Sequence, residues 1–264
     1  MGQARIFALF LLIFFMAATA GAAEQKTGFL SGRLMIKNGG PLADGMAFLF
    51  NHAAGPPPSP EKYWRVPDEI VPIDKDGRFK AELLEGKYYL GAIKRLAGKE
   101  IGPPQEGDFF LISRDTSGEP KTYLVNKGGE TDVGTIAEAA PFKRATLKLK
   151  EGITAIEGTV VGPTGKPIDG ALVFAFLTPS MVGKPVFVSE RTDKDGKFLL
   201  RVFGSDHYYL KTRDVYGGGP PKVGSVIGSY GEDAPIAVNV KAGEIKKGIE
   251  IKVVRFTGQG PKQK

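Results

Sequence analysis

The chain repeats itself, and this repeat restricts its fold more than any other feature does. The segment "DKDGRFKAELLEGKYYL" begins at Asp74, and "DKDGKFLLRVFGSDHYYL" begins at Asp193. Both begin with the acidic motif Asp-Lys-Asp, continue with Gly-x-Phe and end with Tyr-Tyr-Leu. A repeat spaced by the length of a small domain predicts two units of one fold rather than a solenoid.

Three further blocks match in the same order. They are "SGRLMIKNGGPLADGMAFLF" (31–50) with "EGTVVGPTGKPIDGALVFAF" (157–176), "IGPPQEGDFFLIS" (101–113) with "GGPPKVGSVIGS" (218–229), and "VNKGGETDVGTI" (125–136) with "VNVKAGEIKKGIEI" (238–251). Such order indicates an internal duplication. We expect a first domain at 24–142, a second domain at 143–257, and a flexible basic tail at 258–264.

Within each half, apolar residues recur at every second position. This alternation is clear in "RFKAEL" (78–83) and "KFLLRV" (197–202), and it is typical of strands with one buried face. Further strands are expected at 155–161, 171–177, 185–190, 207–213, 236–240 and 249–256, between turns rich in Gly, Pro and Asp. About seven short strands in each half predict an all-β protein of two β-sandwiches.

The order of motifs resembles that of the carboxypeptidase regulatory-like family. In the second half the motifs are Gly158 to Val173, Asp193 to Phe198, and Tyr208 to Leu210; in the first half they are Gly32 to Ala47, Asp74 to Phe79, and Gly86 to Leu90. The resemblance implies two tandem transthyretin-like (prealbumin-like) antiparallel β-sandwich domains, a fold shared with carbohydrate-binding-type modules. It specifies a fold and no activity. "GSDHYYL" is one residue longer before the tyrosine than its counterpart.

The N-terminal segment "MGQARIFALFLLIFFMAATAGAAE" has one basic residue, an apolar run from Ile6 to Ala18, and small residues after it. This pattern predicts a secretory signal peptide at 1–23. The alternative is a retained membrane anchor, but the run is shorter than the roughly 20 residues that cross a bilayer. We expect an exported bacterial protein, periplasmic or extracellular, that is not integral to the membrane after cleavage.

The sequence contains no cysteine, which excludes disulfides, thiol-bound cofactors and a lipid anchor on cysteine. His52 and His207 lie in different halves, so they form no visible ligand cluster. Ser205, Asp206 and His207 are sequence neighbours, a spacing that does not place three side chains in triad geometry. No catalytic, cofactor or metal site is predicted, and the chain is predicted not to be an enzyme.

The acidic turns at Asp74 and Asp193 are the one pattern that suggests calcium. Calcium binds six to eight oxygen atoms, and the sequence after each turn lacks the further ligands of a calcium loop. The other interpretation is a hairpin turn, in which the aspartate binds backbone amides and Gly77 or Gly196 adopts positive φ. We favour the turn.

The first half alone contains the proline-rich segment "HAAGPPPSPEKYWRVPDE" (52–69). Its Tyr63, Trp64 and Arg65 are candidates to stack on a sugar ring or to contact a protein partner; alternatively they pack the loop onto its own sandwich. Both halves also contain Gly-Pro-Pro, in a loop that either stiffens one end of the sandwich or binds a ligand. Tyr216 and Tyr230 lie near the second of these loops and are further candidate contacts.

The formal net charge is +7, and the second half carries the excess of basic residues. Lys246, Lys247, Lys252 and Arg255 either protect a terminal edge strand or form a patch for an anionic surface, together with the tail. No nucleic-acid-binding module is present. The sequence therefore predicts an exported, non-enzymatic binding or structural protein of the cell envelope. The alternative is a carbohydrate-binding module that uses the loop aromatics. We expect the chain to bind an envelope protein or a polysaccharide.

The first prediction concerns export. Because small residues follow the apolar run, the mature protein should begin between Gly21 and Glu24. N-terminal sequencing of the protein released by osmotic shock or found in the medium checks this. Recovery of Met1 or Gly2 in a membrane fraction would contradict it.

Overall fold

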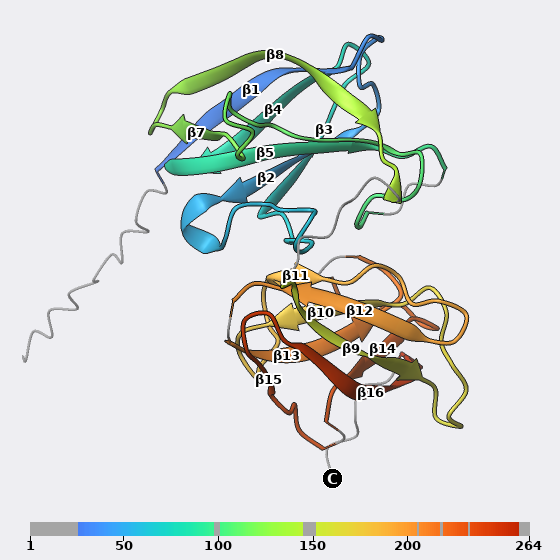
Figure 1. The fold of residues 1–264 in the computed structure, drawn as a ribbon. Coiled ribbons are helices and arrows are strands. Elements are labelled where there is room, and N and C mark those ends of the chain that lie inside the picture. The colour runs from blue at the N-terminus through green and yellow to red at the C-terminus, as the bar shows by residue number, and fades with distance from the viewer. Residues whose placement is uncertain are drawn as a thin grey trace, which may run out of the picture.

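The computed structural model describes residues 26–97, 101–144, 152–204, 206–216, 219–231 and 233–258. It contains two all-β sandwiches, called here the first unit (26–144) and the second unit (152–258), and this confirms the predicted fold class (Figure 1). The predicted signal peptide lies outside the described residues, as does all of the predicted tail except Gly258.

The first unit has eight strands and one 3-10 turn. They are β1 (Thr27–Ile36), β2 (Met46–Asn51), η1 (His52–Ala54), β3 (Glu69–Pro72), β4 (Arg78–Leu84), β5 (Gly86–Lys94), β6 (Phe109–Ile112), β7 (Thr122–Val125) and β8 (Glu130–Pro141). Their order in space is β3-β2-β5-β6-β8-β1-β4, with β7 beside β5. The long strand β8 pairs with β1 over most of its length and with β6 at its last two residues, so it joins the two layers of the sandwich.

The second unit repeats this arrangement strand for strand. It consists of β9 (Thr154–Val161), β10 (Leu172–Phe176), β11 (Phe187–Val188), β12 (Lys197–Val202), β13 (Asp206–Arg213), β14 (Val226–Ser229), β15 (Val238–Val240) and β16 (Ile245–Arg255). Their order is β11-β10-β13-β14-β16-β9-β12, with β15 beside β13. The identical order shows that the repeated sequence blocks are repeated structure.

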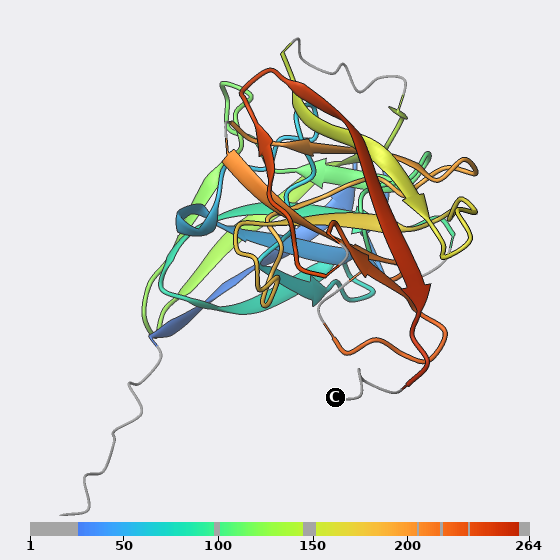
Figure 2. The same cartoon turned by 90° about the horizontal axis from the view of Figure 1, so that it is seen from below.

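One pair of strands in each unit is parallel, where the sequence predicted antiparallel sandwiches. The first and last strands of a unit, β1 with β8 and β9 with β16, lie side by side and run in the same direction. Figure 2 shows this for β16 (red) and β9 (yellow). All other strand pairs among the described residues are antiparallel.

A bulge in the last strand explains a glycine that recurs in both halves. The register of each parallel pair shifts at Gly134 or Gly248, whose φ angles are 74° and 80°. There the bulged strand approaches Gly32 or Gly158 so closely that a Cβ on Gly158 would lie 1.9 Å from the carbonyl oxygen of Ile249. Only glycine leaves room for the bulge.

The acidic turns are tight turns held by the aspartate, as predicted, but they do not close the predicted hairpins, because β3 and β4, like β11 and β12, are not paired with each other. The Oδ1 atom of Asp193 accepts hydrogen bonds from the N–H groups of Asp195 (3.0 Å) and Lys197 (2.9 Å). Gly196, between them, has a φ of 71°. Asp74 accepts the same two bonds in the first unit. The repeated aspartate therefore satisfies backbone amides of the turn.

The repeated tyrosine pair is also part of the fold. Tyr88 and Tyr208 are buried in the cores of their units. Their hydroxyl groups donate to the backbone carbonyls of Leu84 (3.0 Å) and Phe203 (2.8 Å). Burial raises the pKa of Tyr208 to about 12. Each tyrosine thus fills the core and binds the backbone at the connection that precedes its strand, between β4 and β5 or between β12 and β13.

The second prediction separates two costs of replacing a turn glycine: backbone strain at positive φ and close contact of the added Cβ with neighbouring atoms. Gly196→Ala should lower the free energy of unfolding by about 2 to 4 kcal/mol, because it adds a Cβ at positive φ and crowds the buried backbone. That Cβ would lie 2.5 Å from the carbonyl oxygen of Val160. Urea unfolding measures the loss.

Gly170→Ala is the matched control. Gly170 also has positive φ, 75°, but no atom lies within 4 Å of the added Cβ. It should cost only about 1 kcal/mol. Equal losses in the two variants would show that the close contact at Gly196 is unimportant.

Candidate functional site

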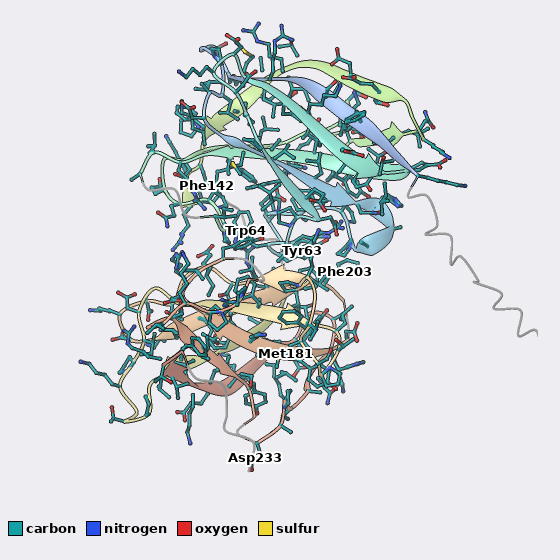
Figure 3. The ribbon with its side chains drawn as sticks, turned by 180° about the vertical axis from the view of Figure 1, so that it is seen from behind. Tyr63, Trp64, Phe142, Met181, Phe203 and Asp233 are labelled. Carbon is teal, nitrogen blue, oxygen red and sulfur yellow. The ribbon has the colours of Figure 1, made fainter. Side chains whose placement is uncertain are left out.

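A loop of the first unit lies against the second unit. Residues 55–67, called here the docking loop, connect η1 with β3 and contain the predicted contact residues Tyr63, Trp64 and Arg65. Figure 3 shows Tyr63 and Trp64 between the two units. The candidate site is therefore a contact between the units.

The docking loop extends a sheet of the second unit. The N–H of Val188 donates to the carbonyl oxygen of Trp64 (3.0 Å), and the N–H of Val66 donates to that of Val186 (2.9 Å). Between these bonds, Arg65 pairs with β11 in antiparallel register. Because β11 is the outer strand of its layer, the loop covers an otherwise open sheet edge.

Tyr63 belongs to the core of the second unit, although it is a residue of the first. Only 2% of its surface is exposed, and its ring packs edge-on against Phe187 (5.1 Å) and Phe203 (5.7 Å). Its hydroxyl donates to the carbonyl oxygen of Pro57 (2.9 Å), and burial raises its pKa to about 12. The core of the second unit is thus completed by the docking loop.

Trp64 lies in an apolar cluster drawn from both units. The cluster comprises Trp64 and Phe142 with Leu172, Phe174, Phe176, Met181 and Val188, and Phe110 packs against it. The indole is 7% exposed, and the guanidinium of Arg201 lies 5.5 Å from its ring centroid. Its Nε1 donates to Glu190 at 3.4 Å.

Arg65 points back into the first unit and fixes the shape of the loop. Its guanidinium donates to the carbonyl oxygens of Asn51 (2.6 Å), Gly55 (3.2 Å) and Pro56 (2.5 Å). It also pairs with Asp68 at 2.9 Å. Burial lowers the pKa of Arg65, and the charge of Asp68 opposes this shift. The first unit therefore presents the loop in a preformed shape.

The structure thus brings the three predicted contact residues together, and the surface they touch is partly the chain's own second unit. The sequence left open whether these residues bind a partner or pack onto their own sandwich. Tyr63 and Trp64 instead pack onto the neighbouring sandwich. With Trp64 7% exposed, its indole face has no room for a sugar ring in this arrangement.

The Gly-Pro-Pro loops are stiffened by arginines near the ends of the strands that precede them. In the first unit, Arg95 donates to the carbonyl oxygens of Gly102 (2.7 Å) and Pro103 (3.0 Å). In the second unit, Arg213 donates to that of Gly219 (2.7 Å). These contacts support the interpretation of the loops as stiff connections at one end of each sandwich.

The two tyrosines near the second Gly-Pro-Pro loop lie in different surroundings. Tyr216 packs edge-on against Phe174 (5.6 Å), and together with Gly102 it lines the contact between the units. Burial raises its pKa. Tyr230 is half-buried against the core of the second unit, and its N–H donates to the carbonyl oxygen of Leu210 (3.0 Å).

The predicted basic residues Lys246, Lys247, Lys252 and Arg255 are exposed on β16. This strand is the outer strand of its layer over its first part only, because its last residues pair with β14. Arg255 donates to the carbonyl oxygen of Gly224 (3.0 Å). Protection of a sheet edge therefore accounts for the first lysines and not for Arg255, and contact with an anionic surface stays a prediction.

An open groove of about 800 Å³ lies on the outer face of β9, β12 and β16. Its charged lining residues are Arg144, Glu157, Glu190, Arg191, Asp193, Lys197, Arg201 and Glu250. A groove of about 680 Å³ occupies the equivalent face of the first unit. Sequence reasoning did not identify Glu190 or Arg201; the only signal was the outward position of Arg201 in the alternating strand β12.

Two negative findings apply to the part of the chain that the structure describes. It contains no group of three or more His, Cys, Asp or Glu side chains able to hold a metal ion. It also contains no helix long and apolar enough to cross a bilayer.

No family model matches the chain, and no curated protein matches its sequence. Among solved structures, the Bacillus anthracis TIE protein is 17% identical over 87% of this chain, with a TM-score of 0.26, and this chain spans about a third (34%) of that protein. GBS52, a minor pilin of Streptococcus agalactiae, is 15% identical over 89% of this chain and 100% of its own, with a TM-score of 0.25. BcpA, the major pilin subunit of Bacillus cereus, is 11% identical over 88% of this chain and 100% of its own, also with a TM-score of 0.25. At these values no property of those proteins transfers to this chain.

The third prediction tests the role of Tyr63. Tyr63→Ala should destabilise the second unit by about 3 to 5 kcal/mol, because it removes a buried aromatic ring from that unit's core. Hydrogen exchange should accelerate at amides of β11 and β13, while amides of β1 and β4 keep their protection.

Tyr63→Phe is the control, since it keeps the ring and removes only the bond to Pro57; it should cost about 1 kcal/mol. The prediction fails if Tyr63→Ala accelerates exchange only in the first unit.

Proposed function

We propose that this chain is an exported, non-enzymatic binding or structural protein of the bacterial cell envelope. It consists of two sandwiches of the carboxypeptidase regulatory-like type that are held together as one rigid body. The observation that carries the proposal is the docking loop, which places Tyr63 in the core of the second unit and pairs its backbone with β11.

The contact between the units has the character of a core. Contacts between domains of one chain are usually polar and permit relative motion. Here an aromatic cluster, a shared core residue and two backbone hydrogen bonds join the units. Salt bridges at its margin link Lys184 with Glu69 (3.2 Å) and Arg144 with Glu190 (2.8 Å). A fixed relation between two sandwiches suits a protein that spans a distance or presents surfaces in a set geometry.

The sequence supports export to the envelope. The N-terminal segment has the pattern of a secretory signal peptide, and the chain has no cysteine. A chain without disulfides depends on its apolar cores for stability outside the cell, and completion of the second core by the first unit enlarges the area buried.

A non-catalytic role fits the surroundings of the histidines. His52 stacks on Tyr89 with ring centroids 5.6 Å apart, and His207 lies 3.1 Å from its neighbour Asp206, both with exposed side chains. They lie in different units. Ser205, the third member of the sequence triplet, lies outside the described residues.

The fourth prediction tests rigidity by distance measurement between spin labels. The chain has no cysteine, so Lys87→Cys and Asn239→Cys, at exposed positions of β5 and β15, label one site in each unit. The distance distribution should be single and as narrow as that of the control pair Lys197→Cys and Asn239→Cys within the second unit.

Adding Tyr63→Ala and Trp64→Ala should broaden the distribution between units and leave the control pair unchanged. A native distribution as broad as that of the double variant would contradict the rigid body. Fractionation of a bacterial host tests the location separately, and full-length protein retained in the cytosol would contradict export.

A further inference from the structure

The groove on the second unit ends against the first unit. Arg144, which follows β8 of the first unit, lines this end. Arg201 of β12 also lines it, and its Nη1 donates to the carbonyl oxygen of Pro60 in the docking loop (2.8 Å). A smaller hollow of about 190 Å³ shares Arg144, Glu190 and Arg191 with the groove, and its lining includes the Gly-Pro-Pro loop of the first unit. Both units therefore build this place.

We call the place the arginine cleft and define it by Arg144, Glu190, Arg191 and Arg201. It contains three guanidinium groups and one carboxylate. Glu190 is 2.8 Å from Nη2 of Arg144 and 4.0 Å from Nη2 of Arg201, too far for a hydrogen bond to the latter. The nearby acid Glu61 is already paired with an arginine of the first unit, at 2.8 Å. The carboxylate of Glu106 also accepts from the backbone N–H of Arg144 (2.8 Å), and the guanidinium of Arg191 donates to the carbonyl oxygens of Gly170 and Asp214. The three guanidinium groups still outnumber the two carboxylates of Glu190 and Glu106.

Arg201 is a buried cation with incomplete compensation. Its side chain is 4% exposed, and its Nη2 has no hydrogen-bond partner among the residues that the structure describes. Burial lowers the pKa of Arg201, the charges of Glu190 and Glu61 oppose this shift, and the charge of Arg144 adds to it. A buried charge is costly unless a counter-charge is near. A second anion in the cleft would offset this cost through space.

Arg144 is the group that a ligand can reach, because its side chain is 65% exposed. The rest of the groove is less suited to an anion. Glu250 and Lys197 both lie beside Thr159 at the far end, and Glu157 is opposite Leu199, midway between Lys197 and Arg201. Lys197 and Arg201 are four residues apart on one face of β12, about 13 Å along a strand. Only the end beside the first unit has an excess of basic groups.

We propose that the arginine cleft binds a carboxylate or phosphate group of an anionic polymer. Arg144 contacts the anionic group directly, and the buried positive charge of Arg201 attracts it through space. The shared chemistry is a planar or tetrahedral oxyanion, which guanidinium groups bind through paired N–H donors. The inference rests on the proposed function, because an envelope polymer is the source of the anion.

Trp64 provides a reporter for the test. It is the only tryptophan of the chain; its Nε1 is 3.4 Å from Glu190, and its ring lies against Arg201. Full-length mature protein is titrated with inorganic phosphate, with an oligogalacturonate as the carboxylate probe, and with a neutral oligosaccharide, all at constant ionic strength. The Trp64 emission should change saturably with at least one anionic probe and not with the neutral one.

Arg144→Gln should weaken this binding about tenfold, because one charge-assisted contact is lost. Lys87→Gln is the matched control. It removes one exposed positive charge on β5, a strand that does not line the arginine cleft, and should leave the affinity unchanged. Thermal unfolding verifies that both variants are folded.

A response to phosphate alone or to the carboxylate alone supports the proposal and identifies the source of the anion. Absence of a saturable response to both, or equal weakening by the two variants, overturns it. The distance measurement and the fractionation are independent of this result. If no anionic probe binds, but the distance distribution is narrow and the protein is exported, the anion site is wrong and the proposed function still stands.

Discussion

The burial of Tyr63 in the core of the second unit is the contact on which the rest of the arrangement depends. It fixes the docking loop against β11, and the loop in turn places Trp64 between the two sandwiches. Arg65 anchors the other side of the loop in the first unit. Adjacent residues of one short segment therefore contact different units: the side chains of Tyr63 and Trp64 pack on the second unit, and that of Arg65 is bonded within the first. The two units share buried apolar residues, and residues of both line the arginine cleft beside the loop.

Much of the fold followed from local rules of sequence. Alternating apolar residues predicted strands such as β4 and β12, and Gly196 marked a turn because positive φ is cheap only for glycine. The parallel pairing of β9 with β16 was not predictable, because residues about 90 positions apart in the chain form it and no local pattern encodes direction. Strand β14 was missed as well, since Val226–Ser229 is short and contains a glycine that weakens the strand pattern.

The candidate site was predicted in its residues and not in its surroundings. The sequence distinguished Tyr63, Trp64 and Arg65 because an aromatic pair in a proline-rich loop has no local reason to be there. The sequence did not show which residues pack against Tyr63 and Trp64, because most of those residues belong to the second half. Glu190 and Arg201 were missed for a related reason. Alternation in β12 assigns Arg201 to the solvent side, whereas in the structure its side chain is 4% exposed and donates to Pro60 of the docking loop.

The position of the docking loop in the chain determines the order in which the protein can fold. The loop belongs to the N-terminal half, so it leaves the ribosome before the strands that receive it. The first sandwich can therefore act as a template on which the second condenses, and the docking loop is already present to cover the edge of β11 when that strand forms. An open edge of this kind is where newly made β-proteins associate wrongly. A chain with the same two sandwiches in reverse order would expose that edge throughout the synthesis of its partner.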